Sequence, residues 1–242
     1  MRVLIFFAGL GGILNQSNVS AQEIGAVNSE VDFSGIYAVG VYTGVPTRVE
    51  EPDVYPFTEE GERTHNAYDW FTLDPRQLDD CVGDPVPELL WSANPMEIVQ
   101  EEGRILMRFE ENDTTRSIIM NGIPPSEEQP LTRLGYSIGH WEGSVLVIET
   151  THMVSGVIFG SDGYPISQGT RITERYWRES GENDLQVEIL VDDSINYTET
   201  VRLGRQWVWS PDEQVRPWGC FSLGPRDSEP DIDGLARMLE EL

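Results

Sequence analysis

The chain contains no lysine: its 16 basic residues are all arginine, against 42 aspartates and glutamates. The formal net charge is −26 at pH 7. A surface this acidic repels phosphate backbones and anionic lipids, so we expect no nucleic-acid partner. A solvated acidic surface, as in salt-adapted proteins, is the simpler interpretation, and capture of a cation is the alternative. No D-x-D-x-D-G loop ending in glutamate supports a calcium site.

Histidine and cysteine are scarce. His65, His140 and His152 are scattered along the chain, and the H-E-x-x-H, C-x-x-C and P-loop patterns are absent. These absences disfavour a histidine-ligated metal and the common cofactor folds. We therefore expect neither a metal nor a cofactor.

Only one apolar run is long, and it lies at the N-terminus. Arg2 precedes the run from Val3 to Leu14, and Val19-Ser20-Ala21 forms a small-residue cleavage site. The run is too short for a permanent membrane-spanning helix. We expect residues 1–21 to be a signal peptide and residues 22–242 to form one domain. That domain would be exported to the periplasm or the outside, with no membrane insertion after cleavage.

The two cysteines, Cys81 and Cys220, lie far apart in the sequence. In an oxidising compartment an even pair most simply forms one disulfide. A nucleophilic thiol is the alternative, but neither cysteine has the histidine-rich or helix-N-terminal neighbourhood that activates a thiol. The disulfide is the preferred interpretation.

The chain from Pro95 onward shows the two-residue periodicity of β-strands. Residues 104–110 place Ile105, Met107 and Phe109 on one face, and residues 184–193 alternate in the same way. Glu142-Gly143 lies between two strand-like segments and reads as a hairpin turn. Helices are expected from Thr58 to about Trp70 and over residues 231–242. About nine or ten mostly antiparallel strands predict an all-β, calycin- or lipocalin-like barrel rather than a sandwich.

Charged residues interrupt several of these strands: Glu110, Arg116, Glu149, Glu174, Arg175 and Glu188. Ion pairs in the barrel wall and outward-facing, solvated positions are the simplest explanation. Because Glu174 and Arg175 are consecutive in a strand, one of them must point inward. The functional alternative is a cofactor-independent lyase, isomerase or hydratase. Glu174 or Glu149 would then be the base, Tyr136 the acid and Arg116 the anion anchor.

Tryptophans are numerous for a domain of this size and either fill the core or line a cup. The leading hypothesis is binding of a small, largely apolar molecule inside the barrel. A third possibility is an envelope-associated structural protein without a ligand. The sequence leaves the oligomeric state open. The candidate ligand-binding residues are Arg116, Tyr136, Trp141, Tyr176, Trp177 and Trp207.

The segment GYSIGHWEGSVLVIETT, from Gly135 to Thr151, resembles the signature G-x-S-x-G-x-W-E-G-D-x-L-V-V-[DE]-T-T of a large group of uncharacterised exported bacterial proteins. The segments PFTEEGE, PMEIVQ and ITERY, and the two cysteines, extend this resemblance over most of the chain. It implies export and a lipocalin-like barrel, but no reaction. Tyr136 and Ile166 stand where the group often carries histidine, which puts any histidine chemistry of the group in doubt for this chain.

Overall fold

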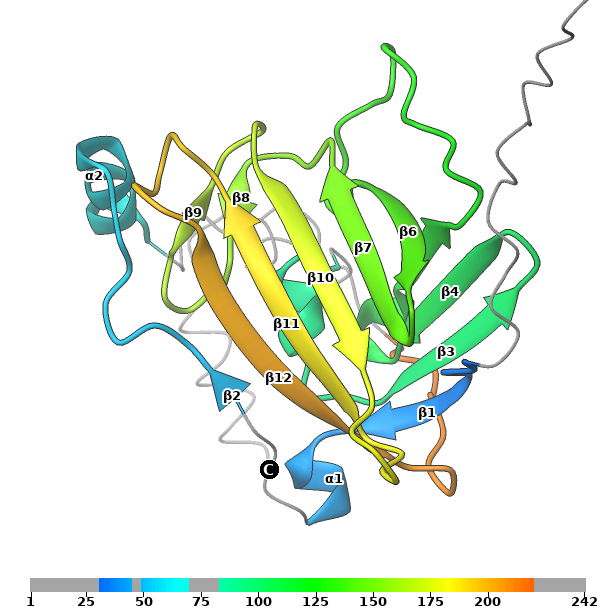
Figure 1. Cartoon of the computed structure of the whole chain (residues 1–242). Helices are drawn as coiled ribbons and strands as arrows, with labels where there is room; N and C mark the ends of the chain where they lie inside the picture. The colour runs from blue at the N-terminus through cyan, green and yellow to red at the C-terminus, as the bar shows by residue number, and fades with distance from the viewer. Residues whose placement is uncertain (1–30, 45–48, 70–82, 220–242) are drawn as a thin grey trace, which may run out of the picture.

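The strands close into a ring. The computed structural model describes residues 31–44, 49–69 and 83–219. Within them, nine strands follow one another around a barrel, and β1 closes it by pairing with both β3 and β12 (Figure 1). These strands are β1 (Gly35–Ala38), β3 (Met96–Glu101), β4 (Arg104–Phe109), β5 (Thr115–Ile119), β6 (Tyr136–Glu142), β7 (Val145–Thr151), β10 (Arg171–Trp177), β11 (Leu185–Asp192) and β12 (Val201–Trp209). The prediction of a mostly β, closed barrel is confirmed.

Three short strands lie outside this ring. β2 (Val49–Glu50) adds to the edge of β12 beside β1, through the pairs Gly204 with Glu50 and Arg205 with Val49. β8 (Gly156–Val157) and β9 (Pro165–Ile166) form a separate two-stranded hairpin in the connection from β7 to β10.

One pair of neighbours in the ring is parallel. β5 and β6 pair in parallel over only two residue pairs, Ile118 with Ser137 and Ile119 with Ile138. Residues 120–135 carry the chain back to the start of β6 and rise as a long loop beside β6 and β7 (Figure 1). The expectation of an antiparallel barrel therefore holds for the other neighbours in the ring but fails at this seam, where parallel pairing required the long return connection.

Alternation along the strands sets the inner and outer faces. On β4, Ile105, Met107 and Phe109 are buried, and β11 alternates between buried and partly exposed residues in the same way. The tip of the β6–β7 hairpin is Gly143-Ser144, between the paired residues Glu142 and Val145, and Gly143 has φ of 61°. The predicted turn is confirmed.

The helices agree with the sequence in part. α2 (Glu59–Ala67) begins after Thr58, whose hydroxyl accepts a hydrogen bond from the Gly61 amide, as predicted. Residues 31–45 are rich in β-branched and aromatic residues and predict a strand with bends. The structure has the shorter β1 there, with α1 (Gly40–Thr43) after it. The sequence also predicts a last strand over residues 214–222; the structure has no strand in its described part, residues 214–219. The predicted signal peptide, both cysteines and the predicted C-terminal helix lie outside the described residues.

The barrel interior is filled. A short 3-10 helix, η2 (Glu88–Trp91), lies within the ring of strands, teal behind β10 and β11 in Figure 1, and its Leu89 and Leu90 are completely buried. Arg205 points inward from β12 and donates hydrogen bonds to the carbonyls of Leu90 and Ser92, at 2.8 and 2.7 Å. The proline-punctuated segment of residues 73–95 predicts a wrapped loop. In its described part, residues 83–95, η2 instead places Leu89 and Leu90 in the core. A second 3-10 helix, η3 (Glu111–Asp113), joins β4 to β5.

No helix among the described residues is both long and apolar enough to cross a membrane.

Gly61 allows α2 to dock on the turn before β12. A Cβ added at Gly61 would lie 2.0 Å from the carbonyl oxygen of Asn196. Alanine normally favours a helix over glycine by about 1 kcal/mol. We nevertheless expect Gly61→Ala to lower the free energy of unfolding by about 1–3 kcal/mol, because the helix must shift. Urea unfolding measures it, and Asn66→Ala, exposed on the same helix, should not destabilise the protein.

Asp193 organises the turn on which α2 rests. Its carboxylate accepts hydrogen bonds from the Ser167 amide, the Thr170 hydroxyl and the Asn196 side chain. Burial alone would raise the pKa of Asp193, but hydrogen bonds from Asn196, Ser167 and Thr170 hold it below its ordinary value.

A carboxyl group whose pKa is lowered by folding stabilises the protein above its unfolded pKa of about 4, and this contribution is lost as pH falls through the folded pKa. We expect the difference in unfolding free energy between wild type and Asp193→Asn to be constant above about pH 5 and to shrink toward pH 2. Urea unfolding across this range measures it. A difference independent of pH would contradict the assignment.

Candidate functional site

A buried ion pair joins β5 to β10 inside the barrel. The Arg116 guanidinium donates two hydrogen bonds to the Glu174 carboxylate, at 2.9 and 2.5 Å. The side chains are only 1% and 0% exposed, respectively. The sequence left open which of Glu174 and Arg175 points inward. In the structure Glu174 points inward and Arg175 outward.

Hydroxyl groups provide further hydrogen bonds to both members of this ion pair. Arg116 also donates to Ser137 on β6 and to Thr150 on β7, the latter at 2.6 Å. The Tyr176 hydroxyl donates to Glu174 at 2.7 Å. Burial would lower the pKa of Arg116, but the charge of Glu174 and its hydrogen bonds raise it. Burial raises the pKa of Tyr176 well above its usual range, so this hydroxyl stays a donor. We call these five residues the interior network.

The predicted catalytic set is not assembled. Glu149 lies on the outer face, where it pairs with Arg171 at 3.0 Å. Tyr136 also faces outward, and its hydroxyl donates to the carbonyl of Ile123 at 3.1 Å. Glu174 lies on the opposite side of the barrel wall. The hypothesis that Tyr136 and a buried carboxylate share one site is corrected here: neighbouring positions on β6 face opposite sides, and it is Ser137 that points inward.

The aromatic candidates are spread over three places. Tyr176 and Trp207 are buried in the interior, where Trp207 packs against Phe109 and Arg205. Trp141 lies near one end of the barrel against Phe33, with ring centroids 5.3 Å apart. Trp177 shares the outer face with Arg175, and its indole nitrogen donates to Glu179. They do not line one internal cup.

Gly135, Ser137 and Gly139 carry the G-x-S-x-G letters of a hydrolase nucleophile, but not its structure. The serine of such a motif sits on a sharp turn between strand and helix. Ser137 instead lies within β6, is buried, and accepts hydrogen bonds from Arg116. Ser137 therefore belongs to the interior network and has a structural role.

A cleft opens where β5 and β6 separate. Its volume is about 440 Å³, and its lining includes Ile119, Leu134 and Tyr136 with the polar residues Ser117 and Thr132; Arg116 and Ser137 of the interior network also border it. Ile123 and Leu131, on the loop between the two strands, are 56% and 40% exposed. Of the predicted ligand-binding residues, Arg116 and Tyr136 line this cleft.

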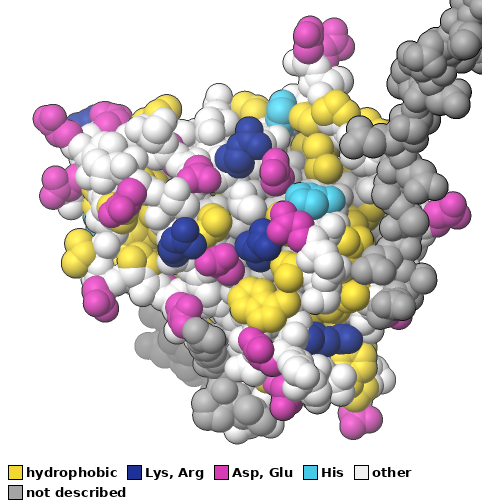
Figure 2. All heavy atoms as spheres, viewed as in Figure 1, with side chains coloured by type: hydrophobic (Ala, Val, Ile, Leu, Met, Phe, Trp, Pro, Cys, Tyr) yellow, Lys and Arg dark blue, Asp and Glu magenta, His cyan; other side chains and the backbone are white. Residues whose placement is uncertain are grey.

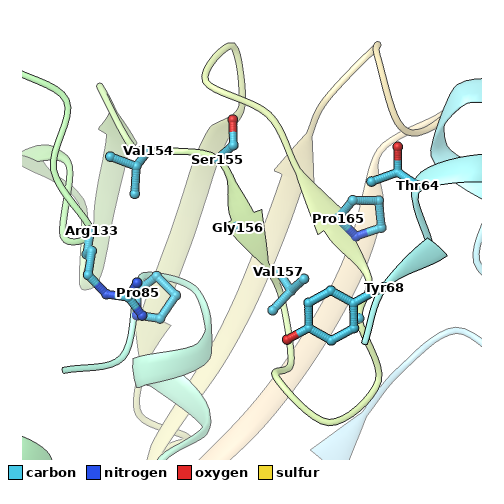
Figure 3. A pocket seen from close by; sticks show the side chains of 10 residues that line it. Thr64, Tyr68, Pro85, Arg133, Val154, Ser155, Gly156, Val157 and Pro165 are labelled. Atoms are coloured by element: carbon cyan, nitrogen blue, oxygen red, sulfur yellow. The ribbon is translucent and has the colours of Figure 1, made fainter. Parts of the chain in front are cut away.

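A second, smaller pocket of about 260 Å³ lies between α2 and the β8–β9 hairpin. Figure 3 shows Tyr68 and Val157 on one side of it and Pro85 and Arg133 on the other. Arg133 lines both this pocket and the cleft, and its Nε donates to the carbonyl of Gly83 at 2.6 Å.

Sequence reasoning missed Arg205 and Leu134. Burial lowers the pKa of Arg205 to about 10. Arg205 lies two residues from both Leu203 and Trp207, and this spacing could have indicated that it shares their inward strand face. Leu134 lies in the proline-rich return connection, where no periodicity exists to mark it. Among the described residues, no group of three or more histidine, cysteine or acidic side chains could hold a metal ion.

No family model matches the chain, and no curated protein matches it. Among solved structures, the crystal structure of a mutant of the fluorescent protein UnaG is similar, with 14% sequence identity and a TM-score of 0.32. The alignment covers 70% of this chain and 98% of that chain. The barrel assignment therefore rests on the strand pairing of this chain itself.

The interior network should tolerate loss of both charges better than loss of one. Glu174→Gln leaves Arg116 buried without a counter-ion, and we expect it to cost about 3–5 kcal/mol of unfolding free energy. Combining it with Arg116→Met removes the stranded charge, so the double variant should be more stable than Glu174→Gln alone. Urea unfolding of the three proteins measures this. A double variant less stable than the single one would contradict the buried pair.

Proposed function

We propose that the protein binds a small, largely apolar molecule in the cleft between β5 and β6. The observation that carries this proposal is a cleft of about 440 Å³ bordered by apolar side chains. Pockets for small ligands commonly span about 300–1,000 Å³ and combine apolar walls with a few polar groups.

The apolar character extends beyond the cleft itself. The loop of residues 120–135 presents Ile123 and Leu131 to solvent next to a wall that contains Leu134. Exposed apolar side chains gathered around a concave site are typical of ligand or partner surfaces. They support this cleft over the barrel interior, which η2 and the interior network fill.

The polar groups of the cleft favour an uncharged ligand. Arg116 is committed to Glu174, Ser137 and Thr150, so an anionic group would have to displace a buried carboxylate to reach it. The Tyr136 hydroxyl donates a hydrogen bond to the carbonyl of Ile123, and its oxygen can still accept one. The hydroxyls of Ser117 and Thr132 can also accept hydrogen bonds. A ligand with one or two hydroxyl or amide groups suits this lining.

Catalysis is the weaker alternative, because the carboxylate and phenol it requires face opposite sides of the wall. A ligand-free structural role would leave the cleft without an occupant. Export to the periplasm or the outside remains part of the proposal, supported by the N-terminal sequence and by the resemblance of Gly135–Thr151 to exported proteins.

Filling the cleft mouth tests the proposal. Ser117 lines the cleft, whereas Thr115, two residues earlier on the same exposed face of β5, does not. We expect Ser117→Trp to weaken binding of the uncharged apolar dye Nile red at least tenfold, with Thr115→Trp close to wild type. Fluorescence titration measures both. Equal affinities in the two variants, or no binding to wild type, would refute the site.

The native ligand can be sought separately. Native mass spectrometry of the protein purified from its own host should show a non-covalent adduct that Ser117→Trp lacks and Thr115→Trp retains. An adduct carried equally by both variants would place the ligand elsewhere.

A further inference from the structure

A shallow hollow lies on the outer face of the barrel, away from the cleft. Its volume is about 300 Å³, and it spans β10, β11, β12 and the short β2. The side chains that project outward into it are those of Trp177, Gln186, Glu188, Arg202 and Glu50. Nothing in the proposed function uses it.

Strand register brings these residues together. Trp177 pairs with Gln186, and in the next row Glu188 pairs with Gly204, which pairs with Glu50. Because Gly204 has no side chain, the Glu50 carboxylate leans over it: Oε2 would lie 3.0 Å from a Cβ placed there. With strands about 4.8 Å apart, the hollow extends roughly 14 Å from Trp177 to Glu50.

The groups are held in place by their own partners. Arg202 donates to Glu188 at 2.9 Å, and the Trp177 indole nitrogen donates to Glu179 at 2.9 Å. The N–H of the indole is therefore already hydrogen-bonded, and its apolar ring forms one wall of the hollow. Arg202 and Glu188 are 68% and 36% exposed, so each has hydrogen-bonding capacity toward the hollow.

We infer that this hollow binds the ring of a neutral saccharide. A hydroxyl group donates to a carboxylate and accepts from a guanidinium, so adjacent sugar hydroxyls satisfy Glu188 and Arg202 without breaking their pair. An ammonium or an anion satisfies only one of the two and must compete with the other. The apolar C–H face of a sugar ring fits against Trp177, as apolar surface fits an aromatic wall.

Saturation-transfer NMR on the full-length protein tests this inference. The probes are glucose, galactose, mannose and N-acetylglucosamine with their β-1,4-linked disaccharides, and spermidine and sulfate serve as charged controls. We expect saturation transfer to the ring protons of at least one neutral saccharide, reduced at least tenfold in Trp177→Ala and restored in Trp177→Phe. Arg171→Ala, on the outer face of β10 but outside the hollow, should bind as wild type does.

The outcomes separate this site from the cleft. Trp177→Ala should still bind Nile red, which shows that it is folded, and Ser117→Trp should still bind the saccharide. Binding of spermidine or sulfate but of no saccharide would overturn the inference in favour of an ion site. Absence of any saccharide signal at millimolar concentration, or a signal unaffected by Trp177→Ala, would overturn it entirely.

Discussion

The ion pair between Arg116 and Glu174 reinforces one of the two shortest strand pairings in the barrel. Backbone pairing between β5 and β6 covers only two residue pairs, whereas the neighbouring ladders are longer. Arg116 on β5 crosses this seam with hydrogen bonds to Ser137 on β6, Thr150 on β7 and Glu174 on β10. Side-chain bonds therefore supply the cohesion that the parallel pairing lacks. A buried pair of this kind specifies one arrangement, because either charge alone in the interior is strongly unfavourable.

The same seam gives the molecule its cleft. A fully paired antiparallel strand in place of β6 would close the wall and remove the space beside Ile119 and Leu134. The barrel keeps its interior for packing, with η2 and Trp207 inside, and leaves the site in the wall. The cleft borders the stabilising network at Arg116 and Ser137, whereas residues at its mouth such as the exposed Ser117 lie outside the core.

The sequence predicted what local alternation controls. The inner face of β4 and the opposite directions of Glu174 and Arg175 follow from a two-residue period, and the hairpin at Gly143 follows from the turn preference of glycine. Three features depend on contacts between distant segments and left no local signal. They are the parallel return of β6, the insertion of Leu89 and Leu90 into the core from a proline-rich segment, and the close approach of Glu50 to Gly204. Alternation also shows that two faces differ without showing which one is inside, so it could not reveal that Tyr136 faces away from the buried Glu174.

The charge distribution bears on both sites. On the face shown in Figure 2, arginines lie beside carboxylates. Arg171 pairs with Glu149 between the adjacent strands β10 and β7, and Arg175 of β10 pairs with Glu142 of β6 across β7. With these arginines paired, the net charge of −26 surrounds the molecule with a negative potential. Such a field disfavours the approach of anions and leaves neutral molecules unaffected. The arginines that border the two sites already have partners: Arg116 is bound to Glu174, Arg202 to Glu188, and Arg133 donates through its Nε to the Gly83 carbonyl. The global field and the local pairing therefore act in the same direction, against anionic ligands.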